Sequence, residues 1–226
     1  MGTVRRAVVF DIDDTLYLER DYVRSGFAAA GAWARTELGL ADLGERAWGI
    51  FEAGVRGRIF DEALVACGTR ADGAVVARLV EVYRSHVPAI EPFPDVAAWL
   101  AGRPADVAVA VVTDGPLASQ RAKAAALGLA AWADPIVFTA DLGPGRGKPH
   151  PAAFVIVEEA VGVPGTACAY VADNPAKDFA GPRSRGWRTV RVRREGALHA
   201  AVASGDDVDA EITALAELDR GLGWPG

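Results

Sequence analysis

Short apolar runs rich in valine and alanine recur along the chain, separated by longer segments in which apolar residues return every three or four positions. The runs cover residues 4–10, 107–112, 135–139, 167–172 and 187–192. Short runs that are apolar on both faces predict strands of a buried parallel sheet, and the segments beginning at Ser119, Pro151, Lys177 and Asp207 predict helices. The alternation therefore predicts an α/β fold with a doubly wound, mainly parallel, Rossmann-like sheet.

One long segment interrupts this alternation. Residues 18–92 show helical spacing of apolar positions and no convincing strand. Its far edge is marked by Pro88, Pro92 and Pro94. Proline lacks an amide donor and restricts the residue before it, so these three favour an extended linker. We expect a helical insert over residues 18–92 and an α/β core over residues 1–17 and 93–226.

Composition narrows the class of partner. The 226 residues carry 24 Lys and Arg against 30 Asp and Glu, a formal net charge of −6. An acidic balance gives no general attraction to nucleic acid or to an anionic membrane, so an anionic ligand has to be bound locally. The longest apolar stretch, residues 124–133, is too short to cross a bilayer. No secretory h-region follows Arg5 and Arg6, and we expect a cytoplasmic protein.

Carboxylates and hydroxyls follow three of the predicted strands. They are Asp11, Asp13 and Thr15 after the first, Thr113, Asp114 and Gly115 after the second, and Asp173, Asn174 and Asp178 after the fourth. Ligands of open α/β sheets bind outside these strand ends, where Lys148 also lies in a glycine-rich loop. Converging carboxylates repel each other unless a hard, oxygen-seeking cation such as Mg²⁺ neutralises them. The lysine and threonine are then suited to face a phosphate.

In these residues the sequence resembles the haloacid dehalogenase superfamily. Its phosphatase members carry D-x-D-x-T, a Thr or Ser after the second strand, a Lys, and a final acidic pair spaced D-x-x-x-x-D. The matching residues, in order, are Asp11, Asp13 and Thr15, then Thr113, then Lys148, then Asp173 with Asp178. One departure is Ala172, where many members have glycine before the metal-binding aspartate. A methyl group there removes no ligand.

The resemblance implies a phosphatase in which Asp11 is the nucleophile and forms an aspartyl-phosphate. Asp13 would protonate the leaving alcohol and then activate the hydrolytic water. Mg²⁺ would be bound by Asp11, by the backbone carbonyl of Asp13 and by Asp173. The remaining implied roles are phosphoryl binding by Lys148, Thr113 and the amides near Asp114 and Gly115, loop orientation by Thr15, and support of the metal or the lysine by Asn174 and Asp178.

The helical insert has the position of the superfamily's helical cap, which in similar small-molecule phosphatases closes over the active site. The expected substrate is a small soluble phosphorylated metabolite, such as a sugar phosphate, a nucleoside monophosphate or a biosynthetic intermediate. Within the insert, Arg56 and Arg58 are candidates to bind the leaving group. A guanidinium can hold hydroxyls or carboxylates bidentately, and Gly57 between them lets the loop bend.

Three alternatives remain open. A dehalogenase of the same superfamily uses the first aspartate to displace halide and has no need of a second acid, so Asp13 disfavours that reaction. A phosphomutase would retain both Asp11 and Asp13. A non-catalytic binding protein on this fold would be expected to have lost Asp11, Asp13, Lys148 or Asp173, all of which are present.

Other polar residues are expected to be structural. Asp14 has no place in the motif pattern and is expected to cap a helix or to be solvated. The arginines between residues 183 and 194 are expected on the wet face of a strand, and the histidines have no metal-ligand spacing. Cys67 and Cys168 suit neither a disulfide framework nor a zinc site and are expected to be buried thiols.

Overall fold

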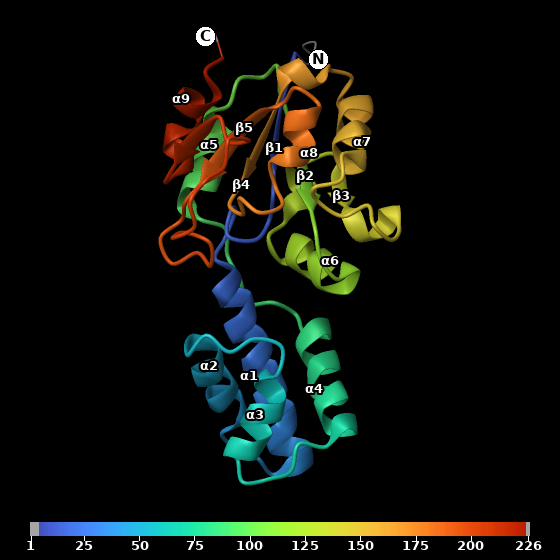
Figure 1. Cartoon of the computed structure of the whole chain (residues 1–226), viewed down its shortest axis with the longest axis vertical. Coiled ribbons are helices and arrows are strands. Elements are labelled where there is room, and N and C mark those ends of the chain that lie inside the picture. Colours follow the sequence, from blue (N-terminus) through green and yellow to red (C-terminus); the bar gives the residue numbers. More distant parts are fainter. Residues whose placement is uncertain (1–4, 225–226) are drawn as a thin grey trace. The chain divides into compact units, whose positions relative to one another are not determined.

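The computed structural model describes residues 5–224, so the expected strand start at Val4 lies outside the described residues. Two compact units divide the chain. One comprises Met1–Glu19 and Glu91–Gly226, and the other comprises Arg20–Ile90 (Figure 1). Within the described range, no helix has both the length and the hydropathy needed to span a bilayer.

The first unit is built on a six-stranded sheet in which every neighbouring pair of strands is parallel. Its strands are β1 (Arg6–Phe10), β2 (Val107–Thr113), β3 (Ile136–Phe138), β4 (Cys168–Ala172), β5 (Arg188–Val192) and β6 (Ala210–Ile212). Their order is β3-β2-β1-β4-β5-β6. This order confirms the predicted doubly wound α/β fold, with the winding reversing between β1 and β4.

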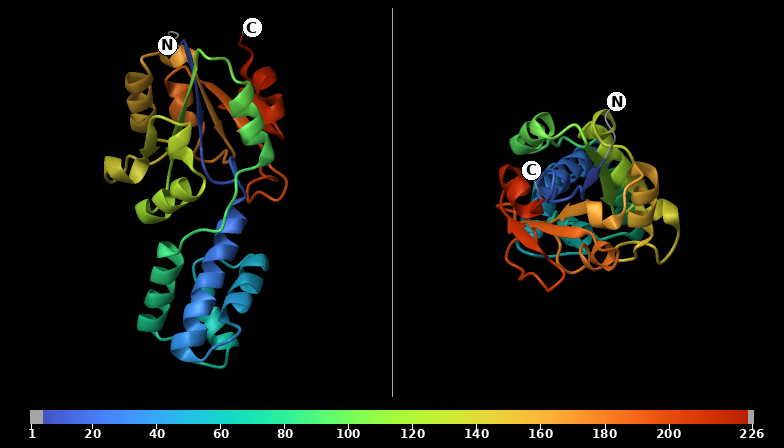
Figure 2. Two further views of the ribbon diagram at one scale, coloured as in Figure 1. Left: turned by 180° about the vertical axis from the view of Figure 1, so that it is seen from behind. Right: turned by 90° about the horizontal axis from the view of Figure 1, so that it is seen from above.

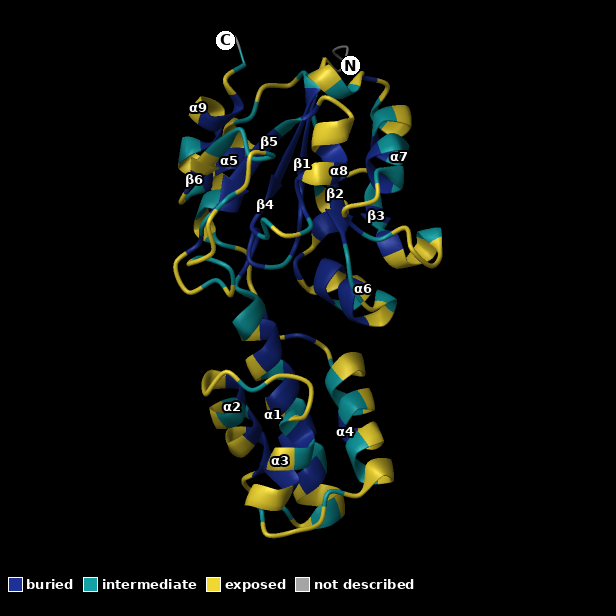
Figure 3. Cartoon of the chain, in the orientation of Figure 1, coloured by how far each residue is buried: buried dark blue, intermediate teal, exposed yellow. Residues whose placement is uncertain are grey.

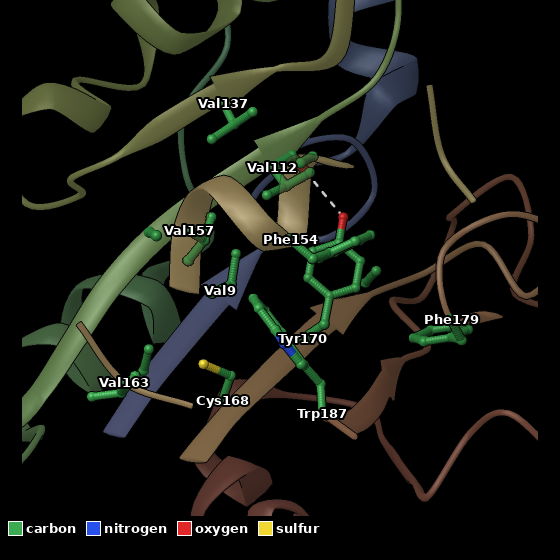
Figure 4. Close-up of a cluster of buried hydrophobic side chains, with 14 residues drawn as sticks. Val9, Val112, Val137, Phe154, Val157, Val163, Cys168, Tyr170, Phe179 and Trp187 are labelled. Carbon is green, nitrogen blue, oxygen red and sulfur yellow. Dashed lines mark hydrogen bonds between the residues drawn. The ribbon is translucent and has the colours of Figure 1, made fainter. Parts of the chain in front are cut away.

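Strand register places apolar side chains on both faces of this sheet. Val9 pairs with Ala110 of β2 and with Tyr170 of β4, so these three share one face, which α7 (Ala152–Val161) covers through Phe154 (Figure 4). The opposite face carries residues such as Phe10. Burial on both faces explains why these strands are continuous apolar runs with no alternating pattern.

Two helices cover the opposite face, α5 (Pro94–Gly102) and α9 (Leu218–Leu222) (Figure 2). The ring of Trp99 in α5 lies edge-on to Phe10, with 5.3 Å between centroids. In α9, an added Cβ on Gly221 would lie 3.3 Å from Val190, so the missing side chain lets this helix approach β5 closely. The other helical elements of the unit are α6 (Leu117–Ala126), α8 (Ala180–Ser184), η1 (Leu129–Ala131), η2 (Thr139–Leu142), η3 (Gly165–Ala167) and η4 (Leu215–Glu217).

The second unit is helical and has its own apolar core. Its helices are α1 (Glu19–Leu38), which begins in the first unit, α2 (Leu43–Glu52), α3 (Ile59–Ala66) and α4 (Gly73–Ser85). Phe27 of α1 lies at the centre of this core, with its ring against Phe51, Phe60 and Tyr83. Exposed positions lie on the outer sides of these helices (Figure 3). Residues 20–90 thus have an apolar core separate from that of the sheet.

Two predictions about the carboxyl-terminal part are wrong. The helix expected from Asp207 is instead the strand β6, which pairs with β5, followed by α9 from Leu218. Of the arginines expected on a wet strand face, Arg191 and Arg194 are instead buried. A three-residue strand with a glutamate at its centre, Ala210–Ile212, is too short to show an alternating pattern in sequence.

The two cysteines, both expected to be buried thiols, differ. Cys67 is half-buried, whereas Cys168 is buried as expected.

Candidate active site

The reversal of strand order places two aspartates beside each other at the carboxyl edge of the sheet. Asp11 directly follows β1, and its backbone N–H donates to the carbonyl of Val171 in β4 at 2.9 Å, which extends the strand pairing by one residue. Asp173 directly follows β4. Doubly wound sheets bind their ligands at such a reversal, outside the carboxyl ends of the strands.

Lys148 lies among buried acceptors at this edge. Its Nζ is 2.8 Å from Oδ1 of Asp11 and 2.7 Å from Oδ1 of Asp178, and its side chain is fully buried. It also donates to the hydroxyl of Tyr170 at 3.0 Å, and that hydroxyl donates to the carbonyl of Val112 at 3.0 Å (Figure 4). Burial alone lowers a lysine pKa, but the charges of Asp11 and Asp178 raise the pKa of Lys148 well above its usual value.

The carboxylates of Asp11, Asp173 and Asp178 form a buried acidic cluster, in which one oxygen of each lies within 4.8 Å of the others. Burial, with the nearby charges of Asp11 and Asp178, raises the pKa of Asp173 to about 9. Burial also raises the pKa of Asp11 to about 6, although Lys148 opposes the shift. Oδ2 of Asp173 is buried and has no hydrogen-bond partner among residues 5–224. Crowded oxygen ligands with an unpartnered acceptor fit a hard divalent cation.

The carboxylate of Asp13 lies outside this acidic cluster. Its oxygens accept hydrogen bonds from the hydroxyl of Tyr17 at 2.5 Å, from Nε2 of Gln120 at 3.0 Å, and from Nζ of Lys123 at 2.7 and 2.9 Å. Burial raises the pKa of Asp13, but the charge and hydrogen bonds of Lys123 outweigh it, so the pKa lies below its usual value. Asp13 is therefore held as a carboxylate.

The second motif ends β2 in a tight loop. The hydroxyl of Thr113 donates to Oε1 of Gln120 at 3.0 Å. Gly115 has φ +142°, and a Cβ there would lie 2.9 Å from Nε2 of Gln120, so the position requires glycine. The carboxylate of Asp114 accepts from the hydroxyl of Thr139, which turns its side chain toward η2. The second motif is thus tied to α6 through Thr113 and to η2 through Asp114.

Buried residues around the first motif fix the shape of its loop. Asp14 accepts from the backbone N–H of Glu19, the first residue of α1, at 2.8 Å and from that of Leu198 at 2.7 Å. It therefore caps α1, one of the two expectations for this residue, and it is buried, with φ 51°. The backbone carbonyl of Thr15 accepts from Arg194, while its hydroxyl is buried without a partner in the described part of the chain.

The last motif is tied together by its own backbone. The N–H of Asn174 donates to Oδ2 of Asp178 at 2.9 Å, and the side-chain amide of Asn174 lies 3.0 Å from Nε2 of His199. From β5, Nε of Arg191 donates to the carbonyl of Asp173 at 2.9 Å. The arginine expected to face solvent therefore holds the backbone of an acidic residue of the site.

The two arginines singled out in the helical unit have different environments. Arg56 lies over the ring of Phe51, 4.0 Å from its centroid, and donates to the carbonyls of Phe51 and Val55, both at 2.8 Å. Arg58 precedes α3 and is exposed, with no hydrogen-bond or ion-pair partner in the chain from 5 to 224. Arg56 is thus engaged in its own unit, and Arg58 is open to a ligand.

Sequence reasoning missed four residues that contact the motif side chains. They are Tyr17, Gln120, Lys123 and Tyr170. Tyr170 lies within an apolar run that predicts a strand, so the sequence gives no separate signal for a functional hydroxyl. Gln120 and Lys123 are three positions apart on α6, and a polar pair at that spacing in a helix rich in alanine is a signal that could have identified them.

Comparison with known proteins bears on the same residues. Residues 5–184 match the family described as haloacid dehalogenase-like hydrolase. A glyceraldehyde 3-phosphate phosphatase from Methanopyrus kandleri is 30% identical over 223 residues, 94% of this chain and 95% of that protein. A phosphoserine phosphatase from Thermus thermophilus is 32% identical over 168 residues, 74% of this chain and 64% of that protein.

A solved structure of a 2-haloacid dehalogenase from Pseudomonas syringae is 27% identical, with a TM-score of 0.63, and covers 96% of this chain and 98% of that one. The family match includes both sequence segments that flank the helical unit and every residue of the four motifs. It also ends beyond Asp178, the last of the three carboxylates gathered around Lys148. This chain belongs to the haloacid dehalogenase-like hydrolase family.

Proposed function

We propose that this chain is a Mg²⁺-dependent phosphatase that hydrolyses a phosphomonoester of a small soluble metabolite through an aspartyl-phosphate on Asp11. The observation that supports it most is the packing of Asp11 and Asp178 against the buried ammonium of Lys148, with Asp173 beside them. Two similar proteins are named phosphatases, one for glyceraldehyde 3-phosphate and one for phosphoserine. Both names describe hydrolysis of small phosphomonoesters.

Asp11 is the proposed nucleophile. It follows the central strand β1, and only 4% of the residue is exposed. Lys148 donates a hydrogen bond to one of its carboxylate oxygens. The lysine offsets the repulsion between this carboxylate and an incoming phosphoryl group. The hydroxyl of Thr113 and the amides of Asp114 and Gly115 would bind the remaining phosphoryl oxygens, which requires Thr113 to release its bond to Gln120.

The residues that would hold Mg²⁺ are Asp11, Asp173 and, through its backbone carbonyl, Asp13. The unpartnered oxygen of Asp173 fits this assignment, and so does the pKa of its carboxyl, which burial and the nearby charges of Asp11 and Asp178 raise. Asp178 would support the site by holding Lys148. Bound Mg²⁺ would neutralise charge between the nucleophile and the phosphoryl group.

Asp13 is the proposed acid and base. In the free protein Lys123 keeps it ionised, the form needed to activate water in the second half of the reaction. To protonate the leaving oxygen in the first half, Asp13 has to take up a proton. Binding of an anionic substrate favours this step, because a nearby negative charge raises a carboxyl pKa.

We propose that residues 20–90 act as the cap and contact the leaving group, with Arg58 as the stronger candidate of the two arginines. Its guanidinium is exposed and unpaired within the described residues, whereas Arg56 is bound to Phe51 and Val55. A planar fork of donors suits a hydroxyl, a carboxylate or a second phosphate of a small metabolite.

A screen of phosphorylated metabolites for release of inorganic phosphate tests this function. We expect release with Mg²⁺ from at least one metabolite and from 4-nitrophenyl phosphate, and loss of release in excess chelator. Equal activity with and without chelator would contradict the metal assignment. The same screen includes a 2-haloacid, because a dehalogenase is among the similar solved structures. Halide release without phosphate release would favour that reaction instead.

A further inference from the structure

Two polar side chains of α6, Gln120 and Lys123, are buried next to the first motif although neither belongs to a motif. Each is only 3% exposed. Most of their helical neighbours are alanines. An ion pair buried in a protein contributes little to stability compared with apolar residues of the same volume, so burial of Lys123 is not explained by stability alone.

Lys123 fixes both oxygens of Asp13. Its Nζ lies 2.7 Å from Oδ1 and 2.9 Å from Oδ2. Tyr17 donates to Oδ1 and Gln120 donates to Oδ2, so each oxygen has a second donor of its own. A carboxylate with two donors on each oxygen is restricted in rotation about both of its side-chain bonds. Its orientation is therefore set by residues outside the motif.

Gln120 links Asp13 to the second motif. Its Nε2 donates to Asp13, and its Oε1 accepts from the hydroxyl of Thr113. The two ends of one amide therefore join the loop after β1 to the end of β2. Because Nε2 is committed to a carboxylate acceptor and Oε1 to a hydroxyl donor, the amide has one orientation that satisfies both.

We propose that Lys123, with Gln120, is a positioning residue for proton transfer: it holds the carboxylate of Asp13 in the orientation from which Asp13 reaches the leaving oxygen. This inference rests on the proposed phosphatase function. It places a determinant of leaving-group protonation on α6, in the same unit as Asp11, and links that determinant through Gln120 to Thr113, one of the groups proposed to bind the phosphoryl oxygens.

The kinetic test compares substrates that differ in their need for an acid. The parameter is kcat/KM, which covers steps up to departure of the leaving group. For Lys123→Met we expect a loss of about 10²-fold or more with an alkyl phosphate such as glyceraldehyde 3-phosphate. With 4-nitrophenyl phosphate, whose leaving group needs little protonation, we expect a loss below about 10-fold. Arg121→Gln, an exposed position on α6, is the control and should leave both values unchanged.

A double-mutant cycle separates positioning from general damage. If Lys123 acts through Asp13, adding Lys123→Met to Asp13→Asn should cause no further loss with the alkyl phosphate. Lys123→Arg, which keeps a cation, should recover part of the activity. A multiplicative loss in the double variant, or equal losses for both substrates, would overturn the proposal. Lys123→Gln serves as the second variant if Lys123→Met does not fold.

A crystal structure of Lys123→Gln tests positioning without turnover. We expect the carboxylate of Asp13 to leave its place between Tyr17 and Gln120, or to occupy two orientations. An unchanged Asp13 would overturn the inference even in an active enzyme. If the wild-type protein releases no phosphate from any phosphomonoester, the proposed function fails, while this structural comparison still decides whether Lys123 positions Asp13.

Discussion

At the scale of single residues, the site is short of positive charge. Asp11, Asp173 and Asp178 carry three negative charges when ionised, and Lys148 supplies one positive charge in contact with two of them. A cluster of this kind is stabilised either by protons on the carboxyls or by a bound cation. Proton and metal binding are therefore expected to compete.

Replacing the nucleophile should separate chemistry from folding. Asp11→Asn keeps the shape of the side chain but removes the nucleophilic oxygen and one charge, so we expect turnover to fall to background. The melting temperature in chelator should be equal to or higher than that of the wild type, because repulsion with Asp173 and Asp178 is reduced. Phosphate release and thermal unfolding measure the two effects. Residual turnover with a labelled phosphoenzyme would point to another nucleophile.

The raised pKa of Asp173 predicts how stability depends on pH. Its carboxyl has a pKa of about 9 in the folded protein and about 4 when unfolded, so between these values the folded state binds more protons. Stability of the metal-free protein should then fall as pH rises from 6 to 9, by up to about 1.4 kcal/mol per unit. Mg²⁺ should raise the melting temperature more at pH 8.5 than at pH 6.5. Equal shifts at both pH values would contradict this.

At the scale of elements, the end of β5 holds the loop that follows β4. Besides the carbonyl of Asp173, Arg191 donates to the carbonyls of His199 and Val202, each at 2.8 Å. A single buried side chain thus joins β5, the end of β4 and residues 199–202. This connection explains why an arginine occupies a buried strand position.

Replacing Arg191 should lower the stability of the protein. In Arg191→Met, the buried carbonyl of Asp173 loses its donor and the partly buried carbonyls of His199 and Val202 each lose one, so we expect the free energy of unfolding to fall by about 1–3 kcal/mol. The affinity for Mg²⁺ should also fall, because Asp173 loses a backbone contact. Urea unfolding and metal titration measure these losses. Arg188→Met, on the same strand and bonded to the carbonyl of Gly221, is the matched control with a smaller expected loss.

Sequence patterns predicted the elements whose signal is local. The five apolar runs correspond to β1 to β5, because buried parallel strands show as continuous apolar stretches. The strand β6 was missed because its three residues are too few to show a strand pattern in the sequence. The motif residues were found from their spacing, but Lys123 meets Asp13 across 110 positions. Such a contact depends on how α6 packs, which no local pattern contains.

At the scale of the whole molecule, phosphoryl chemistry and leaving-group recognition are proposed to belong to different units. The motif residues lie in Met1–Glu19 and Glu91–Gly226, and Arg58 lies in Arg20–Ile90. The core groups contact atoms common to all phosphomonoesters. Substitutions in the helical unit are therefore expected to alter the choice of substrate more than the reaction itself.

The two arginines of that unit should respond differently to truncation. Arg58→Ala should lower kcat/KM for the preferred metabolite far more than for 4-nitrophenyl phosphate, which offers little for a cap to bind. Arg56→Ala should lower the melting temperature, because Arg56 packs on Phe51 and binds two carbonyls. Arg70→Ala, an exposed position in the same unit, is the control. Proportional losses for both substrates in Arg58→Ala would place leaving-group recognition elsewhere.

The central place of β1 has a consequence for biosynthesis. It is made before the other strands of its sheet, and both of its partners, β2 and β4, are synthesised after the whole helical unit. At 5–20 residues per second, the roughly 100 residues up to the end of β2 take about 5–20 s, during which the apolar segment Ala7–Phe10 has no partner strand. Meanwhile residues 20–90 can fold on the ribosome. The growing chain is thus expected to bind chaperones through its first strand until β2 emerges.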